Sequence, residues 1–186
     1  MPKKLLMFVY NDFAEFEVAI LVTAMRATKH SLTTVGPTRA TVTSIGRLSV
    51  QPDAGLADID AADYDALIIP GGVPTPLLEN PLLADLIRTM GARDSLLAAI
   101  CGGPALLGAA GALDGVRYTA SLGPDDDAYA GIVGRGTQLA QPLVVDGNII
   151  TATGSNYLGF AEEVLRHLDG ASTITPLTYF REVTLA

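Results

Sequence analysis

Short apolar runs that end in turn residues recur along this chain. Lys4 to Tyr10, Tyr64 to Gly72 and the run from Leu96 into Cys101 are of this kind, and stretches with helical periodicity separate them. Strands that are buried on both faces read as continuous apolar runs, whereas half-exposed strands alternate. Strands that alternate with helices build parallel sheets with helices on both sides. The pattern therefore predicts an α/β fold, a three-layer sandwich around a mainly parallel sheet.

The same signals predict the remaining elements, and glycine, proline, asparagine and aspartate mark the turns between them. The length of 186 residues fits a single domain spanning residues 1–186, with residues 171–186 as an ordered tail. The further strands expected are Leu32–Gly36 and Val116–Ala120, a hairpin over Thr41–Val50 turning near Gly46, and a hairpin of Leu143–Val145 with Asn148–Thr153. The helices expected are Ala14–Thr28, Pro81–Met90, Ala105–Leu113, Pro124–Ala130 and Tyr157–Leu168.

The composition excludes several classes of function. A formal charge of −8 argues against nucleic-acid partners, because affinity for phosphates depends on Lys and Arg. A single cysteine forms no intramolecular disulfide, which fits a reducing, cytoplasmic location. The apolar run Leu96–Leu113 is broken by Gly102-Gly103-Pro104, so no membrane segment is expected. Neither the spacing of Cys and His nor the glycines of Gly131–Gly136 match a metal or phosphate motif, so no metal or cofactor is expected.

Cys101 is the first candidate for chemistry. It lies between a strand-like run and the helix-like run Ala105–Leu113, with Ala99 two residues before it and Gly103 two residues after. A nucleophile on such a sharp strand-to-helix turn is lifted out of the sheet, and small neighbours make room for it. The start of a helix also favours a thiolate. The alternative is a buried structural cysteine, which is the ordinary role of a lone cysteine.

Glu17 is the second candidate, because it shares a helix face with apolar residues. At about 100° per residue, that face holds Phe13, Glu17, Ile20, Leu21 and Ala24. A carboxylate on an apolar face is costly unless it is paired or protonated, which is typical of a functional group. Two alternatives remain: an exposed residue on a helix of different register, or an acid that the helix dipole stabilises.

The turns after the strands should meet, because the carboxyl ends of neighbouring parallel strands share one edge of the sheet. Gly71 and Gly72 could be a tight turn only, or they could offer backbone N–H groups to a developing oxyanion together with Gly102. His30 and His167 lie at helix ends rather than strand ends, so a Cys-His pair is not expected.

The order of several motifs resembles the ThiJ/PfpI family of the class I glutamine-amidotransferase-like superfamily, which includes parkinsonism-associated deglycase relatives. The matching segments are Asp12–Glu17, Pro52–Asp53, Tyr64–Gly72, Ala99–Gly103 and Thr151–Ser155. The resemblance implies a flavodoxin-like sandwich with the reactive cysteine on the elbow and an acid from the first helix beside it. Cys101 and Glu17 match these two residues, and Gly72 and Gly102 match the backbone donors. It also implies a homodimer.

Two departures from the family pattern narrow the function. Gly102 stands where protease-like members carry a histidine after the cysteine, and Ser121 stands near the place of a second one. Members that hydrate isonitriles usually carry Asp at the acid position and a hydroxyl residue after the cysteine, unlike Glu17 and Gly102. The resemblance therefore implies a glyoxalase-like or hydratase-like enzyme, not a classical protease, in which Cys101 attacks a small electrophile such as an aldehyde.

In that interpretation Glu17 acts as acid or base and holds the pKa of the Cys101 thiol below its usual value. The first alternative is a stress-response protein whose Cys101 is oxidised without turnover. The second is a binding scaffold that keeps the elbow for structure alone. The sequence leaves the identity of the small-molecule substrate open.

Overall fold

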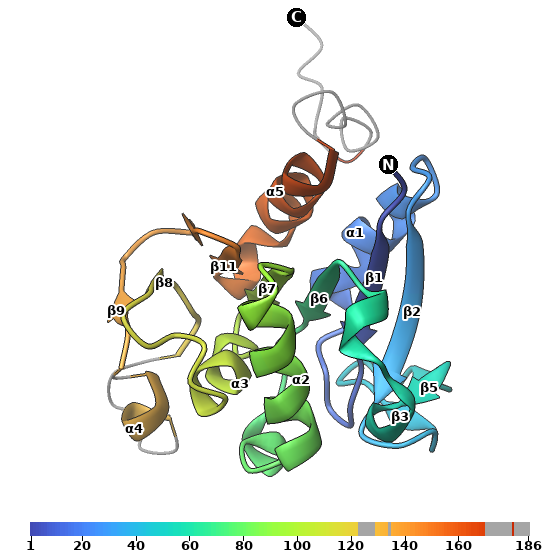
Figure 1. The fold of residues 1–186 in the computed structure, drawn as a ribbon, viewed down its shortest axis with the longest axis horizontal. Coiled ribbons are helices and arrows are strands. Elements are labelled where there is room, and N and C mark those ends of the chain that lie inside the picture. Colours follow the sequence, from blue (N-terminus) through green and yellow to red (C-terminus); the bar gives the residue numbers. More distant parts are fainter. Residues whose placement is uncertain (123–128, 134, 170–179, 181–186) are drawn as a thin grey trace, which may run out of the picture.

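A seven-stranded sheet forms the centre of the computed structural model, which describes residues 1–122, 129–133, 135–169 and 180 (Figure 1). Neighbouring strands are parallel except for the antiparallel pair at one edge, so the predicted α/β fold with a mainly parallel sheet is confirmed. In spatial order the strands are β10 (Leu143–Asp146), β11 (Ile149–Ala152), β7 (Leu96–Ile100), β6 (Ala66–Ile69), β1 (Lys4–Phe8), β2 (Ser31–Gly36) and β5 (Ala54–Gly55).

Helices cover both faces of this sheet. From β1 the chain moves one way across the sheet through α1 (Phe16–Met25) to β2, and from β6 it moves the other way through α2 (Pro81–Ala92) to β7. Right-handed crossovers in opposite directions place α1 and α2 on opposite faces. α5 (Tyr157–Asp169) packs beside α1, and α3 (Pro104–Ala109) packs beside α2.

Smaller elements surround the sheet. β3 (Val42–Thr43) and β4 (Ser49–Val50) form the predicted hairpin, whereas β8 (Arg117–Tyr118) pairs with β9 (Thr137–Gln138) outside the main sheet. The predicted helix Pro124–Ala130 lies mostly outside the described residues, as does the tail at 171–186 apart from Phe180, which packs against the core. The other short helices are α4 (Ala130–Val133), η1 (Leu56–Asp58), η2 (Ala61–Asp63), η3 (Thr75–Leu77) and η4 (Gly154–Asn156).

The carboxyl ends of β1, β6 and β7 come together at the lower edge of the sheet in Figure 1. These strands form the centre of the core, and Ala66–Ile69 and Leu96–Ile100 are buried throughout. Between β1 and β6 the path of the chain across the sheet reverses, which is where ligands bind in open α/β sheets. None of the described helices is long and apolar enough to cross a membrane.

Candidate active site

Cys101 lies on a sharp turn directly after β7. Its φ is 60°, in the left-handed region that residues other than glycine rarely adopt. Such strain persists only where the surroundings fix the backbone. Here the Cys101 N–H donates to the Ala152 carbonyl at 2.9 Å, and the Cys101 carbonyl accepts from the Ser121 N–H at 2.9 Å. The next turn has no room for a larger residue, because a Cβ on Gly103 would lie 2.6 Å from the Ile69 carbonyl oxygen. The chain therefore forms a nucleophile elbow.

Glu17 projects from α1 toward this elbow, and its side chain is 1% exposed. One carboxyl oxygen, Oε2, accepts a hydrogen bond from the Gly71 N–H at 2.7 Å. The same carboxyl group is hydrogen-bonded to the Cys101 thiol, which is partly exposed. The apolar face of α1 is buried through Val18, Leu21 and Met25, and this packing aims Glu17 inward. The structure thus brings together the two residues that the sequence singled out.

The two groups perturb each other's ionisation. Burial raises the pKa of Glu17, although hydrogen bonds from the Cys101 thiol and the Gly71 N–H oppose this. Burial and then the Glu17 carboxylate raise the pKa of Cys101 to about 11, against hydrogen bonds from Ser121 and the Gly102 N–H. The expected lowering of the thiol pKa is therefore wrong. Desolvation and a neighbouring negative charge outweigh the dipole of a helix as short as α3. Between its two ionisations the pair shares a single proton.

The raised pKa of Glu17 makes folding stability depend on pH. Its folded-state pKa lies above the unfolded value of about 4.3, so its contribution is complete below that pH and is lost as the pH rises through the folded-state pKa. Glu17→Gln removes this penalty and keeps an acceptor for the Gly71 N–H. We expect the variant to gain stability over the wild type between pH 4 and pH 7, by about 1.4 kcal/mol for each unit of raised pKa.

Denaturant unfolding at both pH values measures this difference. Glu15→Gln is the matched control, because the pKa of Glu15 is lowered: hydrogen bonds from backbone N–H groups and Ser44 outweigh the effect of its partial burial. Its pH dependence should have the opposite sign. An advantage of Glu17→Gln that stays constant from pH 4 to pH 7 would contradict the raised pKa of Glu17.

The three predicted glycines surround the pair in different ways. The Gly71 N–H is used by Glu17, and a Cβ on Gly71 would lie 2.5 Å from the Cys101 Cβ. The Gly102 N–H donates to the thiol. Gly72 has a φ of 115° and forms an antiparallel bridge with Phe13, and its carbonyl oxygen would lie 3.3 Å from a Cβ on Gly102. Gly71 is therefore a partner of the acid rather than a free donor, whereas Gly72 and Gly102 lie close together.

Ser121 and Gly154 belong to the site, although the sequence did not single them out as functional. The Ser121 hydroxyl accepts a hydrogen bond from the Gly154 N–H at 2.9 Å and donates to the Cys101 thiol. A Cβ on Gly154 would lie 3.0 Å from the Cys101 Sγ and 2.9 Å from the Glu17 Oε1. The sequence signal for Ser121 was its place where related chains carry histidine, and that for Gly154 was the Thr151–Ser155 motif.

The two histidines do not take part in this cluster. His30 accepts a hydrogen bond from the Lys3 N–H at 2.9 Å, and its Nε2 lies 2.8 Å from Asp169 Oδ2. Lys3 precedes β1, so His30 lies at the amino ends of the strands, opposite Cys101. His167 is exposed in the last turn of α5. Among the described residues, no three His, Cys, Asp or Glu side chains are grouped so as to hold a metal ion.

Comparison with known proteins identifies the family of the chain. The family model for the DJ-1/PfpI family matches residues 3–167. The Parkinson disease protein 7 homolog of Danio rerio is 29% identical and is matched over 91% of this chain and 91% of its own. The deglycase PfpI of Pyrococcus furiosus is 26% identical over 80% of this chain and 89% of its own.

Solved structures give the same result. The crystal structure of a DJ-1 superfamily protein from Agrobacterium tumefaciens superposes with a TM-score of 0.84 at 32% identity, covering 96% of this chain and 97% of that one. Such structures have the flavodoxin-like α/β architecture seen here. The chain belongs to the DJ-1/PfpI family.

Proposed function

We propose that the chain is an enzyme in which Cys101 adds to the carbonyl carbon of a small aldehyde and Glu17 supplies the proton. One observation carries this proposal: the buried Glu17 carboxyl group is hydrogen-bonded to the thiol on the elbow, and the Gly71 N–H holds its other side. Two relatives named deglycase, from Pyrococcus furiosus and Pyrococcus horikoshii, support it. A free thiol of this kind suits the reducing cytoplasm.

The addition step balances with the groups present. In the reactive form of the pair, the shared proton is on Glu17 and the charge is on sulfur. The thiolate forms a bond to the aldehyde carbon, the electron pair of the carbonyl π bond moves to oxygen, and Glu17 donates its proton to that oxygen. The product is a hemithioacetal beside a Glu17 carboxylate. That carboxylate can then accept a proton from the adduct, which is the role of a general base.

The site favours an aldehyde over an amide. Amide cleavage needs a group that protonates the leaving nitrogen, and in proteases this is usually an imidazole bonded to the nucleophile. Both histidines of the chain lie away from Cys101. The Ser121 hydroxyl and the Gly102 N–H already donate to sulfur, so they stabilise the thiolate before attack. They can then donate to the aldehyde oxygen, on which the negative charge develops.

Steady-state assays with a 2-oxoaldehyde such as methylglyoxal, followed by analysis for the 2-hydroxy acid, test this proposal. We expect saturable turnover that Cys101→Ser abolishes. The control is a casein-type protease assay at the same protein concentration, which should show no cleavage that depends on Cys101. Turnover that survives Cys101→Ser, or no loss of aldehyde at all, would remove the enzymatic proposal.

Oxidation of Cys101 without turnover is the second candidate function. The observation that favours it is the set of donors around a partly exposed sulfur: the Ser121 hydroxyl and the Gly102 N–H could hold the oxygens of a sulfinic acid. Each of two equivalents of peroxide would transfer one oxygen to sulfur and leave as water or hydroxide. After a peroxide titration, mass analysis of the proteolytic peptide that contains Cys101 should then stop at two oxygen atoms added to Cys101. Ser121→Ala should proceed further, to the sulfonic acid.

A homodimer is proposed from the surface around α1. Phe16, Ile45, Leu48 and Tyr157 are exposed hydrophobic residues, and the rings of Phe16 and Tyr157 pack edge to face at 5.9 Å. The Gly46 N–H donates to Glu15, so the tip of the β3–β4 hairpin lies against the start of α1. Exposed apolar clusters of this kind commonly mark an interface. Light scattering should give twice the monomer mass, and Leu48→Glu should reduce it.

A further inference from the structure

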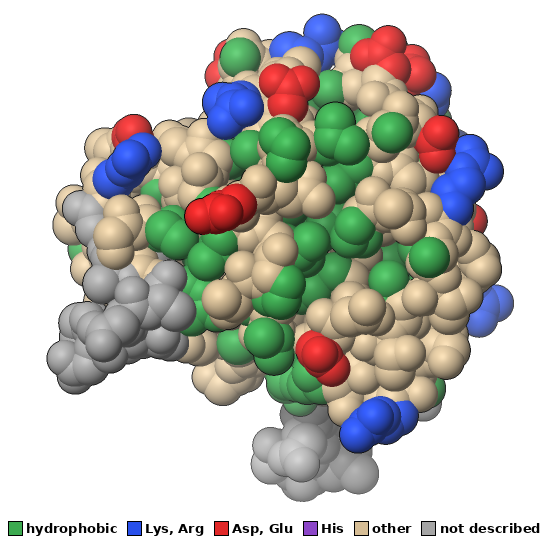
Figure 2. Space-filling view, turned by 90° about the horizontal axis from the view of Figure 1, so that it is seen from below, with side chains coloured by type: hydrophobic (Ala, Val, Ile, Leu, Met, Phe, Trp, Pro, Cys, Tyr) green, Lys and Arg blue, Asp and Glu red, His purple; other side chains and the backbone are tan. Residues whose placement is uncertain are grey.

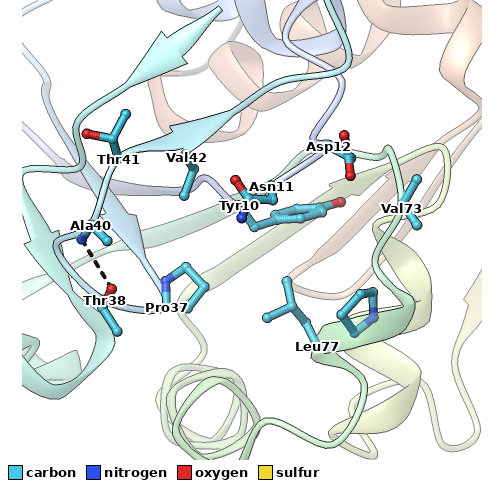
Figure 3. Close-up of a pocket in the computed structure, with 11 residues that line it drawn as sticks. Tyr10, Asn11, Asp12, Pro37, Thr38, Ala40, Thr41, Val42, Val73 and Leu77 are labelled. Atoms are coloured by element: carbon cyan, nitrogen blue, oxygen red, sulfur yellow. Dashed lines mark hydrogen bonds between the residues drawn. The ribbon is translucent and has the colours of Figure 1, made fainter. Parts of the chain in front are cut away.

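A pocket of about 230 Å³, separate from the Cys101 site, opens at the carboxyl ends of β1 and β2, and neither Cys101 nor Glu17 lines it. Figure 3 shows its walls. Pro37 and Val42 come from the segment after β2, and Val73 and Leu77 come from the segment after the Gly71–Gly72 turn. Tyr10 lies between the two walls (Figure 3). Seen from this edge of the molecule, hydrophobic side chains gather at the centre of the surface and charged ones lie around them (Figure 2).

The inner wall of this pocket is fixed in place. Tyr10 is 1% exposed, and its hydroxyl donates to the carbonyl oxygens of Pro70 and Gly71 at 3.1 and 2.8 Å. Its ring stacks on Phe8 with 5.5 Å between centroids. Val42 is 5% exposed and its strand pairs with β4. A site built from groups held this firmly loses little conformational entropy when a ligand binds.

The volume and the apolar walls of the pocket determine which apolar part of a ligand it can accommodate. A dry apolar cavity of roughly 150 Å³ accommodates benzene, so the pocket has room for one ring or a branched aliphatic group with a short substituent. Pro37, Val42, Val73 and Leu77 offer it apolar surface, and the Tyr10 ring completes the wall. Larger ligands would extend into solvent past Val73, which is 48% exposed.

The charged residue that lines the pocket determines which polar group a ligand should carry. Asp12 is the charged residue among those that line it, and no Lys or Arg is present there. The Asp12 backbone is held by bonds to the Thr43 carbonyl and from the Val73 N–H, and its φ is 63°. Its carboxylate makes no hydrogen bond or ion pair with the part of the chain that the structure describes.

The hydroxyl groups of the two threonines that line the pocket, like that of Tyr10, already have hydrogen-bond partners. The Thr38 hydroxyl accepts from the Ala40 N–H at 3.1 Å, drawn as a dashed line in Figure 3. The Thr41 hydroxyl donates to Gln51 Oε1 at 3.1 Å. The carboxylate of Asp12 is therefore the strongest acceptor left for a ligand at the mouth of the pocket, and it favours a cation over an anion.

We propose that this pocket is a second binding site, for a small primary amine whose ammonium group pairs with Asp12 while a ring or branched chain fills the apolar space. The proposal is independent of the reaction at Cys101. Binding is measured by calorimetry and ligand-detected NMR with benzylamine as the probe, benzyl alcohol as its neutral counterpart and benzoate as its anionic counterpart.

We expect saturable binding of benzylamine in the millimolar range, which is ordinary for a single-ring ligand. Benzyl alcohol should bind about two- to fivefold more weakly, because a partly exposed ion pair contributes little more than that. Asp12→Asn, a substitution that tolerates the left-handed backbone, should equalise the amine and the alcohol. Ala40→Phe, at an exposed lining position, should weaken both at least tenfold, whereas Ala62→Phe, exposed in η2 at the other edge of the sheet, should change neither.

Several results would overturn the proposal. These are the absence of saturable binding, benzoate binding as tightly as benzylamine, a preference for the amine that survives Asp12→Asn, and binding by Ala40→Phe equal to that of the wild type. Thermal melts of each variant establish that it is folded. Because alkylation of Cys101 plays no part in the readout, failure here would leave the proposed reaction unaffected.

Discussion

Glu17→Gln should lower the pKa of Cys101 and make the thiol more reactive, yet reduce turnover of an aldehyde by about 10²- to 10⁴-fold. The two effects separate because Glu17 has two roles. Its negative charge raises the pKa of Cys101, and its proton is the one that the oxyanion needs. A neutral amide removes the charge, and so increases the thiolate fraction, but it carries no transferable proton. The Gly71 N–H keeps an acceptor in the variant, so the fold should persist.

Rates of iodoacetamide alkylation against pH measure the first effect. Each unit by which the pKa falls increases the thiolate tenfold, and the accompanying loss of nucleophilicity leaves about a three- to fourfold faster reaction at neutral pH. Glu15→Gln removes the same charge two residues away, where the carboxylate accepts from the Gly46 N–H instead, and should leave both rates unchanged. Slower alkylation of Glu17→Gln would show that the carboxylate is not what keeps the proton on sulfur.

The elbow and the acid could be predicted from the sequence because both depend on local pattern. An apolar strand followed by Cys101, two glycines and a helix-like run favours a sharp turn, and the apolar spacing of Leu21 and Ala24 turns Glu17 inward. The parallel order of β1, β6 and β7 then brings their turns to one edge. These features follow from helix geometry and strand topology, which do not depend on the details of side-chain packing.

The ionisation of the site could not be predicted in the same way. The helix after Cys101 suggested a stabilised thiolate, but the sequence does not show how completely the carboxyl group is removed from water or that it contacts the sulfur. Ser121 was likewise hidden, because its approach to Cys101 depends on a backbone bond between the Ser121 N–H and the Cys101 carbonyl across separate segments. Such distances depend on tertiary packing, which leaves no periodic signal.

The boundaries of short elements were missed for a related reason. The helix expected over Ala14–Thr28 begins only at Phe16, since Phe13 and Gly72 form a bridge just before it. β5 contains only Ala54 and Gly55, which is too short for any alternation to be seen. The start of α1 and the length of β5 both depend on contacts with distant segments. One of these contacts, the bridge between Phe13 and Gly72, also lies beside the turn at Cys101.

Gly154→Ala should reduce turnover about 100-fold while costing only about 1–3 kcal/mol of stability. Gly154 is buried in η4, and a Cβ there would lie 3.0 Å from the Cys101 Sγ and 2.9 Å from the Glu17 Oε1. Both distances are shorter than van der Waals contact, so the thiol, the carboxyl group or both must move away from the methyl group, which disturbs the contact between them. The shared proton then has a longer path, and displacing reacting groups by about 1 Å commonly costs two orders of magnitude.

Gly131→Ala is the matched control, because a Cβ on this glycine of α4 meets nothing within 4 Å, so turnover should be unchanged. For Gly154→Ala, alkylation against pH separates the cause from general damage. If the carboxylate moves away from sulfur, the pKa of Cys101 must fall from about 11, as it does in Glu17→Gln, because the same Coulomb repulsion is weakened. A variant that keeps its fold and its turnover would mean that the contact between Glu17 and Cys101 does not set the rate. A variant that loses turnover with an unchanged thiol pKa would place the damage elsewhere.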